Sequence, residues 1–291
     1  MKKRIFGLFL IAAFTSCQLP TFAALEGVVP DLNKITGGSV TNTIDGLDIK
    51  ANPVKNGVVQ GDWNSFNVGS DKAVNHIFTN WSQTYIHNVL GKDPSQINGT
   101  LKQTTSDLTK DYAGTGKVFL INPNGILFGE GSNVNLNAFT ATTFKPENLK
   151  NLGDLTSSQL SSYEKNLKNY FGPDINIKFS STDDKIGALI KLDNAKFNID
   201  KTAIIAAKDI EVVNGSEIIT NIDYNFSSDL ANKPLNYNQS FSNVKLATGS
   251  GFDSSYKLNG YVYNEDFSVA KGLDGVDYNI VIGSENPTDN T

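Results

Sequence analysis

Short apolar runs separated by turn-forming residues dominate the sequence, and helical periodicity is nearly absent. The runs are rich in β-branched and aromatic residues, and Gly, Asn, Asp and Ser lie between them. They occupy residues 73–78, 84–89, 118–121, 126–128, 186–192, 203–207, 210–213 and 218–222. This alternation of short strands and turns predicts an all-β chain.

Asparagine is frequent throughout the chain. Its side chain forms ladders between neighbouring strands and tolerates left-handed turn conformations. Both properties favour a parallel β-helix, in which similar turns stack coil on coil. The sequence has no strict short repeat, so periodicity alone does not define a solenoid.

One segment departs from this pattern and predicts an α-helix over residues 157–171. Thr156 and Gln159 have the spacing of an N-terminal capping box, and Gly172-Pro173 is a helix stop signal. In a β-helix, such a helix packs outside the coil and covers an edge or an apolar face. The apolar residues that share one of its faces are Leu160, Tyr163, Leu167, Tyr170 and Phe171.

The strongest turn signal is Asn122-Pro123-Asn124-Gly125, between the runs 118–121 and 126–128. Asn suits the first position of a type I turn and Pro presets φ at the second. Gly accepts a left-handed conformation at the fourth. We therefore expect a three-residue hairpin with a Gly bulge at this point.

The first residues have the features of a secretory signal. Residues 1–4 are basic, and residues 5–14 form an apolar core too short to span a bilayer stably. Thr-Phe-Ala at 21–23 is a small-x-small site, which predicts cleavage after Ala23. Lipoprotein processing at Cys17 is the alternative, although the residues before it match a lipobox poorly. No later segment is long and apolar enough to span a bilayer as a helix.

Composition narrows the range of possible partners and covalent crosslinks. The chain has 291 residues, with 25 Lys+Arg against 30 Asp+Glu and a net charge of −5. An acidic chain has no electrostatic support for a nucleic-acid partner. The single Cys lies in the leader, so the mature chain has no disulfide. Either a large core makes disulfides unnecessary, or the chain crosses a second membrane unfolded, where a closed loop would obstruct it.

A carbohydrate-active enzyme is the alternative that the predicted β-helix leaves open, because lyases and hydrolases also use this fold. Such enzymes need carboxylates clustered on one face. Asp183 and Asp184 are adjacent and would point to opposite faces of a strand. Glu211 and Glu217 flank a predicted turn and could approach each other as a glycosidase pair. A periplasmic glycan-binding protein is the non-catalytic form of this alternative.

His76 and His87 are the only histidines in the chain. Both lie in strand-like runs, which favours a structural role over metal ligation. There is no Cys nucleophile after the leader and no phosphate-binding Gly-Lys-Ser/Thr loop. We therefore expect no catalytic residue, no metal site, no cofactor and no enzymatic activity.

Three segments, taken in order, resemble the two-partner secretion domain of exoproteins related to filamentous haemagglutinin and the high-molecular-weight adhesins. The resemblance covers roughly residues 25–143, and a weaker similarity continues to about residue 222. The residues that carry it are Trp63, Phe66, Asn67 and Gly69, then Pro94, Gln96 and Gly99, and finally Asn122, Pro123, Asn124, Gly125 and Ile126.

The resemblance implies a fold, a location and a partner. Family members are Gram-negative exoproteins that pass through the periplasm to the cell surface or the medium. Their secretion domain is recognised by an outer-membrane β-barrel transporter with POTRA domains. It folds outside the cell as a right-handed parallel β-helix with extra-helical hairpins. An adhesin or haemagglutinin role, with a host receptor or glycan as a further partner, is implied in the same way.

Two departures from the family pattern bear on partner specificity. Many relatives carry an upstream Asn-Pro-Asn-Leu motif, and residues 79–85 contain none. This absence places the chain nearer the high-molecular-weight adhesin-like subfamily. The loop at 102–116 is also longer than the family pattern predicts, and its polar residues indicate a surface excursion.

The motif at 122–126 has two candidate roles. An unfolded chain could pair its flanking segments with an edge strand of a POTRA domain by β-augmentation. Alternatively, the turn could matter for folding outside the cell, where folding would prevent the chain from sliding back.

The resemblance also divides the chain. We expect a signal peptide at 1–23, the secretion domain at 24–222, continued β structure at 223–282 and a flexible tail at 283–291. Relatives usually carry a long passenger, so this chain could be a minimal exoprotein, a truncated one or part of a split system. Aromatic residues that could contact glycans, or alternatively fill the core, are Trp81, Tyr85, Tyr237, Phe241, Tyr256, Tyr261, Tyr263 and Tyr278.

Overall fold

The computed structural model describes most of residues 26–220 and four short strands beyond them. The described ranges are 26–54, 57–79, 83–106, 116–146, 149–171, 178–180, 189–207, 209–220, 244–248, 251–253, 261–262 and 279–283. The predicted signal peptide and Asp183-Asp184 lie outside these residues, as does the predicted tail at 283–291 except for Gly283, which ends a strand.

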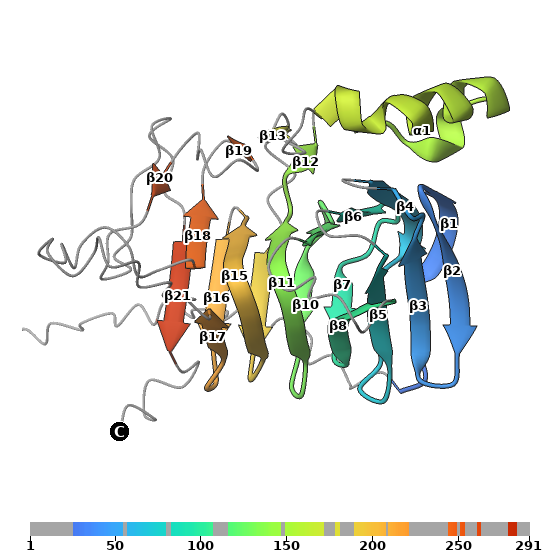
Figure 1. Ribbon diagram of the computed structural model, residues 1–291. Coiled ribbons are helices and arrows are strands. Elements are labelled where there is room, and N and C mark those ends of the chain that lie inside the picture. Colours follow the sequence, from blue (N-terminus) through green and yellow to red (C-terminus); the bar gives the residue numbers. More distant parts are fainter. Residues whose placement is uncertain are drawn as a thin grey trace, which may run out of the picture.

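The chain folds as a right-handed parallel β-helix whose coils present three faces (Figure 1). Face A contains β3 (Gly46–Ala51), β5 (Ala73–Phe78), β8 (Thr100–Thr105) and β17 (Glu217–Thr220). Face B contains β4 (Val58–Ser65), β6 (Thr84–Val89), β9 (Lys117–Ile121) and β18 (Val244–Thr248). The long strands β11 (Asn133–Thr142) and β15 (Lys196–Ala206) pass from face A to face B.

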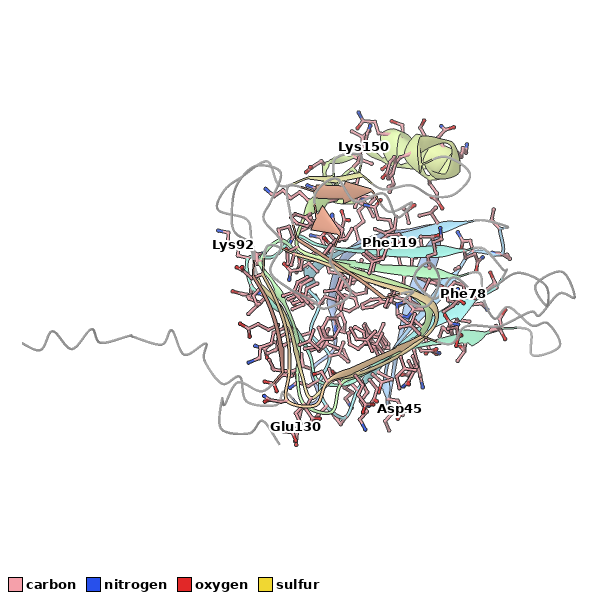
Figure 2. The ribbon with its side chains drawn as sticks, turned by 90° about the vertical axis from the view of Figure 1, so that its left-hand side faces the viewer. Asp45, Phe78, Lys92, Phe119, Glu130 and Lys150 are labelled. Atoms are coloured by element: carbon pink, nitrogen blue, oxygen red, sulfur yellow. The ribbon has the colours of Figure 1, made fainter. Side chains whose placement is uncertain are left out.

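Face C completes each coil with β7 (Ser95–Ile97), β10 (Ile126–Phe128), β14 (Leu189–Asp193), β16 (Asp209–Val213) and β21 (Asn279–Gly283). Figure 2 looks along the coil and shows a roughly triangular section filled with side chains. Phe78 marks the corner between faces A and B, Lys92 the corner between B and C, and Glu130 the corner between C and A.

The core consists of ladders of apolar side chains, one residue from each coil. Because alternate strand residues share a face, the parallel register stacks Leu47, Val74, Leu101, Val134 and Phe197 one above another. All five are buried. Each coil therefore buries its apolar positions only when its neighbours are present, as expected for a solenoid.

Several predicted strands agree with the structure. The runs 73–78, 84–89 and 126–128 coincide with β5, β6 and β10. Of the runs 186–192 and 218–222, residues 189–192 lie in β14 and 218–220 in β17, and the remainder fall outside the described residues.

Two antiparallel strands cover the N-terminal end of the coil. β1 (Asp31–Thr36) pairs with β4 on face B, and β2 (Gly38–Thr43) pairs with β3 on face A. A parallel edge left open would expose unpaired N–H and C=O groups. β1 and β2 satisfy those groups on the first coil.

The predicted helix is confirmed as α1, with bounds Ser157–Phe171. The Thr156 backbone N–H donates to Gln159 Oε1 at 2.9 Å, and the Gln159 N–H donates to Thr156 Oγ1 at 3.4 Å, which is the expected capping box.

The helix follows β12 (Lys145–Pro146) and the 3₁₀ turn η1 (Leu152–Asp154). It precedes β13 (Lys178–Ser180), which pairs with β12 and with β19 (Gly251–Asp253) outside the coil. A further strand, β20 (Tyr261–Val262), pairs with β18.

The helix packs outside the coil and covers apolar residues on the outer side of face B (Figures 1 and 2). Tyr163 is buried there and Leu160 is partly buried. The residues of face B that they and the preceding loop cover include Val58, Ile86, Phe119, Ile121 and Ile204. The side chains of Leu167, Tyr170 and Phe171 lie outside those described. Within the described part of the chain, no helix is long and apolar enough to cross a bilayer.

A glycine at the corner between faces C and A offers a test of coil stacking. A Cβ on Gly99 would overlap the carbonyl oxygens of Gly69 and Lys72, whereas a Cβ on Gly153 would meet no atom within 4 Å. We expect Gly99→Ala to lower the free energy of unfolding by about 1–3 kcal/mol, as overpacking does. Gly153→Ala should change it by less than about 0.5 kcal/mol. Urea denaturation of both variants measures the difference, and equal midpoints would contradict the stacking.

Candidate functional site

The three segments singled out in the sequence lie on consecutive coils and stack at one place. Val68 bridges to Ile97, and Ile97 pairs with Phe128 on the next coil. All three side chains are buried. Residues 29 and 31 positions apart in the chain thus form one ladder at the end of face C.

The Asn122–Gly125 turn is closed as expected for a type I turn. The Gly125 N–H donates to Asn122 O at 3.1 Å, and Gly125 has a φ of 120°. Asn122 Oδ1 accepts the Asn124 N–H at 2.9 Å. This side-chain bond imitates a backbone turn, which explains why Asn is suited to the first position.

The prediction of a hairpin at this turn is wrong. β9 and β10, on either side of the turn, do not pair with each other: β9 pairs in parallel with β6 and β11, and β10 pairs in parallel with β7 and β14. The turn is a corner at which the chain leaves face B and enters face C. A turn signal fixes local dihedral angles, and the same angles serve a corner or a hairpin.

The side chains of the turn hold the corner to the coil below it. Buried Asn122 donates from Nδ2 to Asp93 O at 3.0 Å and to Ser95 Oγ at 2.9 Å. Asn124 donates from Nδ2 to Gly91 O at 2.8 Å. Backbone pairing continues beside them, because the Ser95 N–H donates to Gly125 O at 3.0 Å.

The five motif residues differ in exposure. Asn122, Gly125 and Ile126 are buried, whereas Pro123 and Asn124 are half-buried. The surface of the corner therefore consists of the outer sides of Pro123 and Asn124. This surface offers amide and carbonyl groups, which suit recognition or folding rather than bond cleavage.

The supporting residues of the first two segments have structural contacts. Trp63 and Phe66 are buried and meet edge to face, with ring centroids 5.1 Å apart. Asn67 Oδ1 accepts the Gln96 N–H at 2.8 Å, which joins the first coil to the second. Gly69 and Gly99 lie in contact at the next corner. Pro94 is exposed and Gln96 is half-buried.

Sequence reasoning missed the residues that receive the motif's hydrogen bonds. Ser95 and the carbonyls of Gly91 and Asp93 become partners only through the coil register, which separates them from the motif by about 30 positions. A cluster of Gln60, Asp62 and Asn88 on the outer side of face B was also missed.

The enzyme alternative gains no support from the described residues. Glu211 lies on β16 in face C and is 3.9 Å from Lys191, whereas Glu217 begins β17 in face A. The described part of the chain holds no group of three or more His, Cys, Asp or Glu side chains that could bind a metal ion. Of the aromatic residues considered for glycan contact or the core, Tyr85 is buried in the core, as the second alternative predicts. Trp81 and the side chains of the six later aromatics lie outside those described.

A family model described as the TPS secretion domain matches residues 27–262. Two similar curated proteins, both heme/hemopexin-binding proteins of Haemophilus influenzae, align with the chain. One is 32% identical over 132 residues, which cover 44% of this chain and 13% of that protein. The other is 24% identical over 234 residues, which cover 80% of this chain and 23% of that protein. The aligned regions thus represent less than a quarter of either relative.

A solved structure, the HMW1 secretion domain from Haemophilus influenzae, is also similar to the chain. The sequence identity is 19% and the TM-score is 0.47, and the match covers 80% of this chain and 49% of that one.

The contacts of Asn122 predict a large effect on stability. Asn122→Ala leaves Ser95 Oγ and the Asn124 N–H without the partners described above. Removing one partner of a buried polar group costs about 1–3 kcal/mol, so we expect a loss of about 2–4 kcal/mol in the free energy of unfolding. The Asn135 side chain is exposed, and among the described residues it accepts a hydrogen bond from Asn198 alone. Asn135→Ala is therefore the control and should cost less than about 0.5 kcal/mol in urea denaturation. Equal losses would contradict a structural role for Asn122.

Proposed function

The chain belongs to the family of TPS secretion domains, and on that premise we propose that its corner motif is read by the POTRA domains of an outer-membrane β-barrel transporter. The protein is a two-partner secretion exoprotein. In the proposal it enters the periplasm behind a cleaved signal peptide and passes through the barrel unfolded. It then folds at the cell surface or in the medium.

One observation supports the proposed order, in which recognition by the transporter precedes folding. Both strands that flank the motif, β9 and β10, are paired on both sides in the folded domain. A POTRA edge strand could add to them only by β-augmentation, which needs unpaired backbone N–H and C=O groups. Recognition through these segments therefore requires a chain whose coils have not yet formed.

Folding outside the cell supplies the direction of transport in this proposal. The first coil is capped by β1 and β2, and each later coil pairs with the coil before it. A chain that emerges N-terminal end first can add coils in sequence, as solenoids do. Every coil added buries apolar side chains and opposes return through the barrel.

The exported protein is assigned, within the same proposal, to the adhesin class, with a host receptor or glycan as its target. The two Haemophilus relatives are heme/hemopexin-binding proteins. Both histidines of this chain are buried in the core, and its one Met and one Cys lie within the first 17 residues. The described residues therefore present no exposed imidazole or thioether that could ligate haem. We keep adhesion as the proposed class.

The export proposal predicts dependence on the partner barrel. The protein is expressed in a Gram-negative host with and without a cognate POTRA barrel and is quantified in the medium, on the surface and in the periplasm. We expect it outside the cell only with the barrel. Periplasmic retention in both cases would overturn the proposal and favour the glycan-binding alternative.

The variant Asn124→Ala separates recognition from folding, because Asn124 is half-exposed and has one hydrogen bond to the neighbouring coil. Loss of export, together with less than about 1 kcal/mol change in the free energy of unfolding of the purified variant, would support recognition. Normal export would contradict a recognition role for this residue. A large loss of stability would assign the residue to folding instead.

Transit in the unfolded state predicts that a disulfide across two coils blocks export. Asp48 and Asn75 are register neighbours on β3 and β5, and their side chains are joined by a hydrogen bond of 3.1 Å. The double variant Asp48→Cys/Asn75→Cys should form a disulfide in the oxidising periplasm while the chain is still unfolded, which closes the loop between residues 48 and 75 before transit. The folded coil also accommodates this disulfide, because adjacent strands lie within its Cα range. We expect the oxidised protein to be retained and reductant to restore export. The single variant Asn75→Cys is the control, and export of the oxidised form would contradict unfolded transit.

A further inference from the structure

The two histidines of the chain meet inside the β-helix. His76 on β5 and His87 on β6 are both buried, with exposures of 0% and 2%. Their Nε2 atoms are 2.8 Å apart. Residues 11 positions apart thus form a polar contact inside a largely apolar core.

The hydrogen bonds determine the proton positions. His76 Nδ1 lies 2.8 Å from Lys102 O, and a carbonyl only accepts, so Nδ1 carries the proton of a neutral His76. His76 Nε2 must then accept, and His87 Nε2 must donate to it. His87 Nδ1 is the remaining ring nitrogen, and it has no hydrogen-bond partner among the described residues. Both imidazoles are therefore neutral.

A further proton has no acceptable position in this arrangement. On His76 Nε2 it would oppose the N–H of His87 at 2.8 Å. On His87 Nδ1 it would create a cation between the rings of Trp63 and Phe66, whose centroids lie 5.6 and 4.8 Å from that of His87. A buried cation without a paired anion is unstable in a folded protein.

The strands packed around the pair provide no compensating charge. The register neighbours of His76 are Ile49 on β3 and Gln103 on β8, and those of His87 are Gly61 on β4 and Leu120 on β9.

Among the described residues, the only other titratable side chain against the pair is Tyr85, whose ring lies 5.1 Å from that of His76. Burial lowers the pKa of His76 to about 4. Burial, and then the charge of His76, hold the pKa of His87 well below its usual value. Burial also raises the pKa of the Tyr85 hydroxyl, which stays neutral.

The pair joins the coils that contain the three family segments. His87 contacts Trp63 and Phe66 of the first coil, and His76 donates to a carbonyl of β8 in the third. Separating the two imidazoles would therefore disturb three adjacent coils.

We propose that His76 and His87 form a proton-sensitive lock, which keeps these coils closed at neutral pH and opens them when an imidazole is protonated in mildly acidic solution. Its consequence for export rests on the proposed function: the exported chain would complete folding in neutral medium and would fold incompletely in acidic medium.

The direction of the effect follows from linkage. An unfolded histidine has a pKa near 6.5, and both folded pKa values are lower. The stabilisation of the folded state that comes from keeping both histidines neutral is complete above about pH 6.5. It is lost as the pH falls from there toward about 4. With two protons taken up on unfolding, the folding equilibrium constant should fall by up to about 100-fold per pH unit in this window.

Asp62 is a buried carboxyl group whose shifted pKa acts in the opposite direction. Burial raises the pKa of its carboxyl group, so the folded state binds its proton more readily than the unfolded state does. Protonation of Asp62 therefore favours folding at acidic pH and cannot produce the proposed loss of stability.

The test is urea denaturation of the purified protein at several pH values between 7.5 and 4.5. We expect the wild-type equilibrium constant to fall by at least about 10-fold from pH 6.5 to 5. The double variant His76→Gln/His87→Gln replaces the pair with amides that can still bond to each other, and it should show no such fall. Asp62→Asn is the control and should retain it. A flat wild-type profile, or the same fall in the double variant, would overturn the proposal.

A second measurement tests the proposal with the wild-type protein alone, so it applies even where the double variant does not fold. Proton NMR of the folded wild-type protein should show two imidazole signals that do not titrate between pH 8 and about 5.5. In urea, both should titrate near 6.5. Titration near 6.5 in the folded state would overturn the lock. Neither measurement involves the transporter, so failure of the lock is distinguishable from failure of the export proposal.

Discussion

The structure depends on pairing between coils, because no coil can satisfy its own backbone. Each strand donates and accepts hydrogen bonds with the coils on both sides, and its inward side chains are buried only by those neighbours. At the corners the strands end, and side chains must supply part of the pairing. Asn122 does so at the corner between faces B and C, where its amide donates to the backbone carbonyl of Asp93 and to the hydroxyl of Ser95. The most diagnostic sequence motif therefore coincides with a place where regular pairing stops.

Local patterns predicted the elements that local physics determines. The helix at 157–171 follows from its capping box and apolar face, and the strands at 73–78, 84–89 and 126–128 follow from their β-branched and aromatic residues. Whatever depends on register was not predictable. The turn at Asn122 was expected to close a hairpin because its dihedral angles serve both purposes. The contact of His76 with His87 and the bond from Asn124 to Gly91 require knowledge of which residues stack.

The outer side of face B shows how a buried charge can be retained. Asp62 is fully buried, and burial raises the pKa of its carboxyl group. The carboxylate accepts hydrogen bonds from Gln60 at 3.0 Å and from the Leu152 N–H at 2.5 Å. Tyr163 of α1 donates to Gln60 at 3.0 Å, which extends the cluster to the helix. These bonds offset part of the desolvation cost, and they fix the loop before α1 in a position that apolar contacts alone would not specify.

A parallel β-helix is expected to fold slowly, and slow folding is compatible with export of an unfolded chain. Most contacts of a parallel β-helix join residues one coil apart, about 25–30 positions, so loops must close before pairing stabilises them. The first coil has only the cap formed by β1 and β2 to pair with, and the first three coils must form before the later ones have a template. They also contain both histidines and all three family segments. A constraint placed in these coils controls whether the rest of the solenoid can add, since each later coil needs the preceding one as its template. Under the proposed export route, selection would act most strongly on this N-terminal part, because the segments proposed for recognition also lie in the coils that must form first.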